Sequence, residues 1–562
     1  MKLFGISTHH DSSYCFLDNG KILFHSEIER FTRIKHDPSP VRLYETIYKN
    51  AKQYLDVCDA FVMPINVGEQ GIVNEWHTIN LNIFKDQYNL SKPLYNIGHH
   101  TCHAANVYYG QGIDNALIFT LDGNGWDIKN GTYQLINRSV FKAEGNKLKN
   151  LYFGDFGNPG QFWMMHLSRV FGMSTIFDEG GDESGTLMAM AAYGDPNKHA
   201  HYFDDIAYAV SRPKEWFEYS QIFSDPNHKV LNNTEMALNE KMYYEYDEKV
   251  KFLKQKLDTG EYNRFDLAAS IQSQFEKYLL NFVMSYITYG DTKNICFSGG
   301  SALNCVALGK LAKILKKMGY NVYCDQAPSD SGLSLGAVKY QYFNEFNNPL
   351  VHYKKHSYLG AIYSSTTIRE TLSTYNSLLV TENVDISNIT NLLMSSKIIS
   401  LFNEGSESGK RALGNRSIIA DPRFAYTKDL INEKVKHRKS FRPFAPSVLR
   451  EHVDEWFDFD IDSPYMSFAV AVKEDKQKFV PAILHKDNTA RLQTVTQDDN
   501  GYYYDLISEF YKKTGVPMIL NTSFNDREPI VETPKHAIDC FLKTQIDYLY
   551  FVKEKLLISK IS

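Results

Sequence analysis

Two histidines spaced four residues apart, His99 and His103, are the strongest candidates for chemistry in this sequence. In a helix, side chains at positions i and i+4 lie on the same face, so the pair has the geometry of a two-point metal clamp. Two imidazoles do not fill a coordination sphere, so a metal site here needs carboxylates from elsewhere in the chain. Without them, the simpler interpretation is that backbone groups or solvent satisfy both rings.

Two aspartates that follow predicted strands could complete such a site. The apolar run at 116–121 predicts a short buried strand, and Asp122 comes directly after it. Residues 322–324 predict another strand, and Asp330 lies beyond it in a glycine-containing loop before a helix. Ligands of open α/β sheets bind at the carboxyl ends of the strands. Two histidines with two aspartates and no thiolate favour iron, manganese or zinc, with open positions for substrate.

A third polar group lies near the start of the chain. Residues 2–8 and 14–17 predict two strands, and His10 falls in the loop between them. An imidazole in such a loop could act as a base. An equally good interpretation is that His10 and Asp11 only stabilise the turn.

Two later segments could bind phosphate. A strand predicted at 294–297 leads into Ser298-Gly299-Gly300, and the free amides of a helix start suit a phosphate group. A glycine pair alone is weak evidence for such a site. Near the end of the chain, an apolar strand delivers Asn521-Thr522-Ser523 to a loop, where hydroxyls could bind phosphate or carbamate oxygens. A simple turn explains that segment equally well.

A concentrated group of cations follows residue 409, in a chain whose formal net charge is −5. It includes Lys410, Arg411, Arg416, Lys434, Lys436, Arg438, Lys439 and Arg442. Arginine side chains match phosphate oxygens in a bidentate way, so this group indicates an anionic substrate. Surface solvation explains only a minority of these cations.

Length and composition set wider bounds. At 562 residues the chain exceeds what one hydrophobic core usually supports, and a polar stretch at 343–358 predicts a linker between domains at 1–350 and 351–562. The net charge gives no support for binding to duplex nucleic acid. Seven scattered cysteines indicate reduced thiols. With no signal peptide and no apolar run of transmembrane length, we expect a cytoplasmic protein without membrane contact.

Together these stretches resemble the O-carbamoyltransferases of the nodulation-protein and tobramycin-carbamoyltransferase type. The motifs that carry the resemblance occur in the family's order and cover nearly the whole chain. They are His10-Asp11-Ser12-Ser13, Glu29-Arg30-Phe31 with Lys35-His36, His99-His100-x-x-His103-Ala104-Ala105, Asp122-Gly123, Ser298-Gly299-Gly300 with Leu303-Asn304, Arg411-Ala412-Leu413-Gly414-Asn415-Arg416-Ser417, Phe441-Arg442-Pro443-Phe444-Ala445-Pro446, Arg491-Leu492-Gln493 and Asn521-Thr522-Ser523-Phe524-Asn525. Each motif is weak alone, but the ordered combination is specific.

The resemblance implies an α/β protein with two domains. The N-terminal domain would have the actin/Hsp70-type ATPase fold, similar to the enzyme that forms threonylcarbamoyladenosine in transfer RNA. The C-terminal domain would be YrdC-like, similar to the partner of that enzyme that forms an adenylate. In this family, ATP and carbamoyl phosphate yield carbamoyl-adenylate in the C-terminal domain. The carbamoyl group then passes to an acceptor hydroxyl at the metal site of the N-terminal domain.

The resemblance also implies roles for individual residues. The metal, Fe²⁺ first with Mg²⁺ or Mn²⁺ as alternatives, would be held by His99, His103, Asp122 and Asp330. His10 would take the proton of the acceptor hydroxyl. Nucleotide would bind at Gly299, Gly300, Asn304 and Asp122. Carbamoyl phosphate and the adenylate phosphate would be held by Arg411, Arg416, Lys436, Arg438, Arg442 and Ser523.

Three departures from the family pattern concern the substrate site. Lys410 stands where the family usually has proline, which adds a cation, and Thr186 stands where a lysine is usual. His485-Lys486-Asp487-Asn488 replaces a His-x-Asp-Gly pattern. These differences bear on substrate binding more than on the reaction.

Two other functions stay open from the sequence. A phosphotransferase of the same ATPase fold would use Asp122-Gly123 and the Gly299-Gly300 loop, but would need neither the histidine pair nor the basic segment. A nucleotide-controlled nucleic-acid-binding module would use the cations at 410–442, and its binding would depend strongly on salt. The expected acceptor is a natural-product sugar or cyclitol, or a hydroxymethylated nucleotide. The oligomeric state, a homodimer included, is undetermined.

Overall fold

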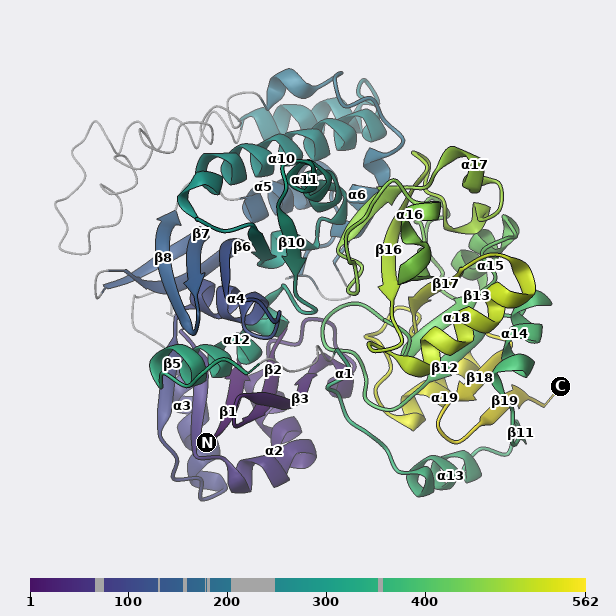
Figure 1. The fold of residues 1–562 in the computed structure, drawn as a ribbon, viewed down its shortest axis with the longest axis horizontal. Coiled ribbons are helices and arrows are strands. Elements are labelled where there is room, and N and C mark those ends of the chain that lie inside the picture. Colours follow the sequence, from purple (N-terminus) through teal and green to yellow (C-terminus); the bar gives the residue numbers. More distant parts are fainter. Residues whose placement is uncertain are drawn as a thin grey trace.

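The computed structural model describes residues 1–65, 75–129, 132–154, 159–176, 178, 182–203, 248–351 and 357–561. Within these ranges the chain forms three β-sheets with helices packed on their faces (Figure 1). Much of the segment at 195–262, to which the sequence assigns no chemistry, lies outside the described residues. None of the described helices is both long and apolar enough to cross a bilayer.

The first sheet has the strand order β3-β2-β1-β4-β5. Its strands are β1 (Lys2–Ser7), β2 (Ser13–Asp18), β3 (Lys21–Glu27), β4 (Ala60–Pro64) and β5 (Leu94–Ile97). The first three are antiparallel, whereas β4 runs parallel to β1 and β5 parallel to β4. The two strands predicted at the start of the chain are therefore confirmed.

Helices cover both faces of the first sheet because its strands are apolar on both sides. Phe4 and Ile6 of β1 belong to the same buried cluster as Leu43 of α2 (Pro40–Val57), which packs beside α3 (Glu75–Gln87). On the other face, Leu3 joins a cluster with Leu335 of α12 (Leu333–Tyr340). Alternate residues of a strand point to opposite faces, so β1 joins the two layers.

The second sheet has the strand order β10-β9-β6-β7-β8. Its strands are β6 (Asn115–Lys129), β7 (Thr132–Glu144), β8 (Lys147–Gly154), β9 (Asn294–Ser298) and β10 (Asn321–Cys324). Helices α4 (His99–Tyr108) and α12 pack between this sheet and the first in one shared apolar cluster. The other face packs against α5 (Pro159–Met165), α6 (Ser184–Ala191), α10 (Arg264–Tyr286) and α11 (Cys305–Lys317).

Strand β6 differs from the short strand predicted at 116–121. It continues to Lys129, and its pairing with β7 shifts after Leu121, which lies opposite Arg138. Gly125 then lies opposite Ile136, so residues 122–124 face only one residue of β7. Asp122 therefore lies in a bulge inside a long strand, and the prediction of a strand end at 121 was wrong. The Gly-Asn-Gly composition of a bulge and of a turn is the same, which explains the error.

The third sheet has nine strands in the order β11-β19-β18-β12-β13-β17-β14-β16-β15. They are β11 (Leu378–Thr381), β12 (Ile399–Phe402), β13 (Arg416–Ala420), β14 (Ala445–Leu449), β15 (Phe468–Ala471), β16 (Thr489–Val495), β17 (Met518–Ser523), β18 (Tyr548–Phe551) and β19 (Leu556–Lys560). The helices of this part are α13 (Ser365–Ser373), α14 (Ile386–Met394), α15 (Tyr426–Lys434), α16 (Val453–Trp456), α17 (Glu474–Gln477), α18 (Gly501–Thr514) and α19 (Pro534–Lys543).

These sheets confirm the α/β class that the sequence predicts, with mixed parallel and antiparallel strands. Three finer assignments stay predictions. They are the actin/Hsp70-type ATPase fold for residues 1–350, the YrdC-like fold for residues 351–562, and the boundary between the two domains.

Two close contacts join the third sheet to the earlier part of the chain. A Cβ added at Gly309 of α11 would lie 2.2 Å from the carbonyl oxygen of Ala469 in β15. In the short helix α1 (Glu29–Thr32), buried Arg30 donates from Nη2 to the Gly409 carbonyl at 2.6 Å. The Gly409 amide in turn donates to Glu27 Oε1 at 2.8 Å. The segment that carries Lys410 and Arg411 is therefore held against the first sheet.

We predict that Gly309→Ala lowers the melting temperature. Alanine in place of glycine inside a helix normally stabilises by about 1 kcal/mol. Here the new methyl group meets the Ala469 backbone, and overpacking costs about 1–3 kcal/mol. Thermal unfolding followed by circular dichroism measures the difference. Lys310→Ala on the same helix is the control, because it removes only an exposed ion pair with Glu276. A higher melting temperature for Gly309→Ala would contradict this packing.

Candidate active site

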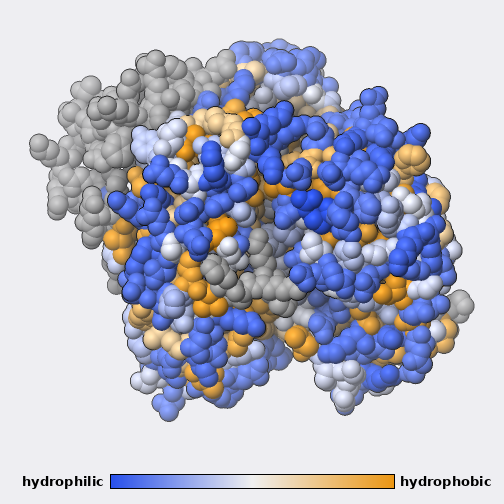
Figure 2. All heavy atoms as spheres, viewed as in Figure 1, coloured by the Kyte–Doolittle hydropathy of each residue, from blue (hydrophilic) through white to orange (hydrophobic). Residues whose placement is uncertain are grey.

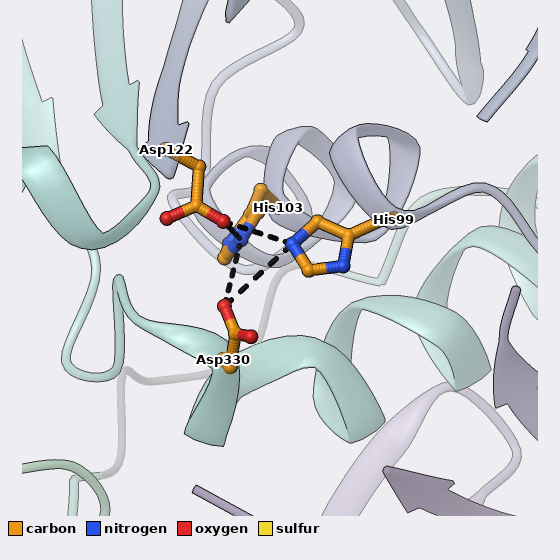
Figure 3. A group of neighbouring side chains, drawn as sticks. All are labelled: His99, His103, Asp122 and Asp330. Carbon is orange, nitrogen blue, oxygen red and sulfur yellow. Dashed lines mark hydrogen bonds and ion pairs between the residues drawn. The ribbon is translucent and has the colours of Figure 1, made fainter. Parts of the chain in front are cut away.

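Four side chains from three elements meet at one point (Figure 3). His99 and His103 come from α4, Asp122 from the β6 bulge, and Asp330 from a single 3₁₀ turn before α12. The Nε2 atoms of His99 and His103 lie 2.9 and 3.4 Å from Asp122 Oδ2. Each also lies 3.6 Å from Asp330 Oδ1. The four ligand atoms lie within 4.8 Å of one another, and all four residues are buried.

The electrostatics of this group suit a bound cation. Burial raises the pKa of Asp122, yet the neighbouring imidazoles of His103 and His99 hold it well below its usual value. Burial lowers the pKa of His103, but the carboxylates of Asp122 and Asp330 outweigh burial and raise it to about 10. The group thus attracts positive charge, and its nitrogen and oxygen atoms suit a transition metal better than Mg²⁺.

A carboxylate outside the group holds helix α4 in place. The helix begins after Gly98 without a side-chain cap of its own. Asp127 of β6 supplies one, since its Oδ2 accepts from the Thr101 amide at 2.9 Å. A Cβ at Gly98 would lie 2.0 Å from Asp127, and one at Gly125 would lie 2.3 Å from the ring of His99. Only glycine fits at these two positions, and the close fit fixes His99 relative to Asp122.

His100 has a structural place between the two ligand histidines. Its Nδ1 lies 2.8 Å from Thr120 Oγ1, and its Nε2 lies 2.9 Å from the Ile136 carbonyl oxygen. Burial and the nearby His99 hold its pKa well below the usual value. The ring is therefore neutral and ties α4 to β6 and β7.

His10 lies at the edge of the four-residue group. Its Nε2 is 3.5 Å from Asp330 Oδ2, and its Nδ1 is 3.8 Å from Asp11 Oδ2. Asp11 also bonds His36 Nδ1 at 2.5 Å and pairs with Lys410 Nζ at 3.1 Å. Burial lowers the pKa of His10, but Asp330 and Asp11 raise it to about 9. Lys410, the residue that stands in place of proline, thus reaches from the later part of the chain to the loop that carries His10.

The Gly299-Gly300 loop packs against the β6 bulge. Gly299 has a φ of 92°, and a Cβ there would lie 2.2 Å from the Leu121 carbonyl oxygen. The Gly300 amide donates to Asp122 Oδ1 at 3.0 Å, so this amide orients a carboxylate of the group. The Asn304 side chain caps α11 by accepting from the Ala307 amide at 3.1 Å. Nucleotide binding by these residues stays a prediction.

A cavity of about 740 Å³ is lined by His99, Asp122 and Asp330 of this group and extends to the third sheet. Among the described residues that line it, the aspartates come from the first part of the chain and the lysines and arginines from the last part. The aspartates are Asp11, Asp122, Asp182 and Asp330. The cations are Lys410, Arg411, Arg438, Arg442 and Arg491. We call the part of the cavity where the arginines gather its basic side and the part at Asp122 and Asp330 its acidic side. The division is not strict, because Lys410 pairs with Asp11 and Asp182 lies near Arg411 and Arg442.

The arginines of the cavity repel one another. Burial and the neighbouring Arg491 lower the pKa of Arg411 to about 9. Burial and the charges of Arg442 and Arg491 hold the pKa of Arg438 well below its usual value. Like charges that destabilise each other in a buried site create a strong attraction for an anion. Arg411, Arg438 and Arg442, predicted as anion ligands, do meet in this cavity.

Two other predicted anion ligands lie outside the cavity lining. Arg416 is fully buried, donates from Nη2 to the Glu404 carbonyl at 3.0 Å, and stacks 3.7 Å from the Phe402 ring. Lys436 donates from Nζ to the Ser523 carbonyl at 2.5 Å and to Asn525 Oδ1 at 2.6 Å. Ser523 itself lines the cavity. Lys436 thus positions Ser523. The Arg416 side chain does not line the cavity, so its position does not support direct contact with a ligand there.

Arg491 and Asp127 are the residues that sequence reasoning missed. Arg491 appears in a motif of the resemblance. Because it lies far from the 410–442 segment in the sequence, it was not grouped with the other arginines. Its position in the alternating pattern of strand β16, between buried neighbours, is the signal that could have found it. No sequence signal marks Asp127, because the helix that it caps begins 28 residues earlier, at His99.

Two carbamoyltransferase family models match most of the chain, the N-terminus over residues 46–339 and the C-terminus over residues 390–560. The nodulation protein NolNO of Sinorhizobium fredii is 29% identical over 97% of this chain and 79% of its own length. The nodulation protein NolO of Bradyrhizobium diazoefficiens is 30% identical over 81% of this chain and 77% of its own length. Among solved structures, full-length HypF in its phosphate- and nucleotide-bound form aligns with 61% of this chain and 55% of its own at 13% identity. Its TM-score of 0.34 is too low to carry an argument about fold.

We predict that His103→Gln weakens Mn²⁺ binding by about 100-fold or more, because it removes one of two buried imidazole ligands. Titration of the protein with Mn²⁺, with the free ion followed by electron paramagnetic resonance, gives the dissociation constant. His437→Gln is the matched control, since His437 is exposed and faces Asp526. Equal Mn²⁺ affinity in the two variants would contradict a metal site at this group.

Proposed function

The chain belongs to the carbamoyltransferase family, and from this premise we propose that it is an ATP- and metal-dependent O-carbamoyltransferase. It forms carbamoyl-adenylate from ATP and carbamoyl phosphate and then carbamoylates a hydroxyl of a small-molecule acceptor. The acceptor is a natural-product sugar or cyclitol, or a hydroxymethylated nucleotide. One observation carries the proposal: the buried histidine–aspartate group and the arginine cluster face the same cavity.

The activation step belongs to the basic side of the cavity. Water cleaves carbamoyl phosphate to carbamate and phosphate, the carbamate oxygen attacks the α-phosphorus of ATP, and pyrophosphate leaves. Both reactants are anions, and negative charge moves onto the departing pyrophosphate. Arg411, Arg438 and Arg442 are placed to neutralise that charge, and Ser523 offers a hydroxyl to a phosphate oxygen.

The transfer step belongs to the acidic side. The acceptor oxygen attacks the carbamoyl carbon, the bond to the adenylate oxygen breaks, and AMP leaves. His10 takes the proton of the acceptor hydroxyl, a role that requires the neutral ring. Asp330 and Asp11 raise its pKa to about 9, and a cation held by Asp330 would offset that effect and favour the neutral form. A divalent metal held by His99, His103, Asp122 and Asp330, with Fe²⁺ as first choice, would supply Lewis-acid polarisation of the carbamoyl group.

A cavity shared by the two steps suits a reactive intermediate. A mixed anhydride is hydrolysed by water, so a shared cavity shortens its exposure to solvent. We assign activation to residues 351–562, as a YrdC-like domain, and transfer to residues 1–350, as an actin/Hsp70-type domain. The distribution of cavity-lining cations and aspartates between these two parts supports that division of labour.

Carbamoyl-phosphate-dependent release of pyrophosphate, measured without acceptor, tests the activation step. We predict that Arg442→Ala slows this release by about 100-fold or more, since it removes a preorganised charge from the reacting phosphates. Lys439→Ala, an exposed cation of the same segment, is the control and should keep the wild-type rate. Release of ADP in place of pyrophosphate would indicate a phosphotransferase and contradict the proposed two-step reaction.

A second variant separates the two steps. We predict that His10→Gln keeps pyrophosphate release within about threefold of wild type, while transfer to an acceptor slows by about 10²–10⁴-fold, the usual contribution of a general base. Accumulation of labelled carbamoyl-adenylate, followed by chromatography after a quench, provides the measurement. Parallel loss of both activities would show that His10 serves activation or folding and not transfer.

A further inference from the structure

The hairpin of β6 and β7 carries a strip of apolar side chains on one face. Trp126 lies opposite Leu135, and Ile128 lies opposite Tyr133 in the register of the two strands. Residues two apart on a strand point to the same side. The two cross-strand pairs therefore share one face of the hairpin, which we call the apolar strip.

The apolar strip faces away from the core. Ile128, Tyr133 and Leu135 are 45%, 43% and 41% exposed. Their neighbours of opposite parity, Asp127 and Ile136, are buried against α4 and its surroundings. On the side of the molecule shown in Figure 2, apolar residues are dispersed among hydrophilic ones, which is the ordinary state of a surface. Three large apolar residues exposed together on one hairpin face, beside a cavity, are typical of a binding surface.

The apolar strip is continuous with the active-site cavity. Trp126 and Leu135 line the same cavity as His99 and Asp122. A strand rises about 3.3 Å per residue, so the Ile128–Tyr133 pair lies about 7 Å farther along the hairpin. The strip thus begins beside the metal-ligand group and leads outward from it (Figure 1 shows the hairpin as β6 and β7).

The absence of charge on the strip indicates the class of molecule that it would bind. The four side chains of the strip, Trp126, Ile128, Tyr133 and Leu135, carry no charge. The strip itself therefore offers no cation to a phosphate group, whereas an apolar scaffold would bury it.

We propose that the apolar strip binds the body of the acceptor, and that the acceptor is a hydroxyl compound with an aromatic or aliphatic scaffold, not a free sugar or a nucleotide. This inference rests on the proposed function. It places the acceptor hydroxyl near His10 and the apolar body along the β6–β7 hairpin. It thereby narrows the acceptor classes to glycosides and other alcohols with an apolar part.

Binding of two matched glucosides tests the inference. Phenyl β-D-glucoside and methyl β-D-glucoside carry the same hydroxyls and differ in one apolar group. Ligand-detected NMR titration of the full chain, without ATP or carbamoyl phosphate, gives both dissociation constants. We expect the phenyl glucoside to bind about tenfold more tightly than the methyl glucoside, and the double variant Ile128→Ser/Tyr133→Ser to lose that preference.

The control is Leu379→Ser/Val380→Ser, a double variant of exposed apolar residues on β11. It should keep the preference for the phenyl glucoside. No detectable binding of the phenyl glucoside, no preference in the wild type, or an equal loss in the two double variants would overturn the inference. The binding assay does not depend on catalysis. Pyrophosphate release together with no preference for the phenyl glucoside would therefore contradict the apolar acceptor site and leave the activation step intact. A preference for the phenyl glucoside without pyrophosphate release would contradict the proposed activation step and leave the acceptor site intact.

Discussion

The burial of two carboxylates against two imidazoles is the constraint on which the rest of the first part of the molecule depends. Charged groups out of water cost several kcal/mol each unless other groups compensate. The chain holds Asp122 and Asp330 opposite α4 by close packing that leaves little freedom. Asp127 caps the helix, and Gly98 and Gly125 leave room where any Cβ would collide. The same close packing keeps the four candidate ligand atoms within 4.8 Å of one another.

A second electrostatic conflict mirrors the first across the cavity. Arginines in the later part of the chain lower one another's pKa, so that part of the site attracts negative charge. One short segment connects the two. Glu27 and Arg30 hold Gly409 in place, and from there Lys410 pairs with Asp11 while Arg411 joins the arginines. The contact between the two parts of the chain is thus also a contact between the two sets of charges.

Much of this arrangement was predictable because its signals are local. The i, i+4 spacing placed both histidines on one face of α4, and the α/β class and the first strands followed from apolar patterning. The predictions that were wrong depend on contacts between residues far apart in the sequence. The glycines after Asp122 indicated a loop, whereas pairing with β7 turns them into a bulge. The cation-rich segment did not reveal which side chains face a ligand, so Arg416 and Lys436 were grouped with residues that line the cavity. Side-chain direction depends on tertiary packing and not on composition.

The proposed reaction places a metal at one side of a single cavity and phosphates at the other. The most direct measurement is a crystal structure of the protein grown with Mn²⁺ and a non-hydrolysable ATP analogue, with anomalous scattering used to locate the metal. The account predicts an anomalous peak among His99, His103, Asp122 and Asp330, and phosphate groups within hydrogen-bond distance of at least two of the cavity arginines. A metal bound elsewhere, or phosphates that contact none of these arginines, would contradict it.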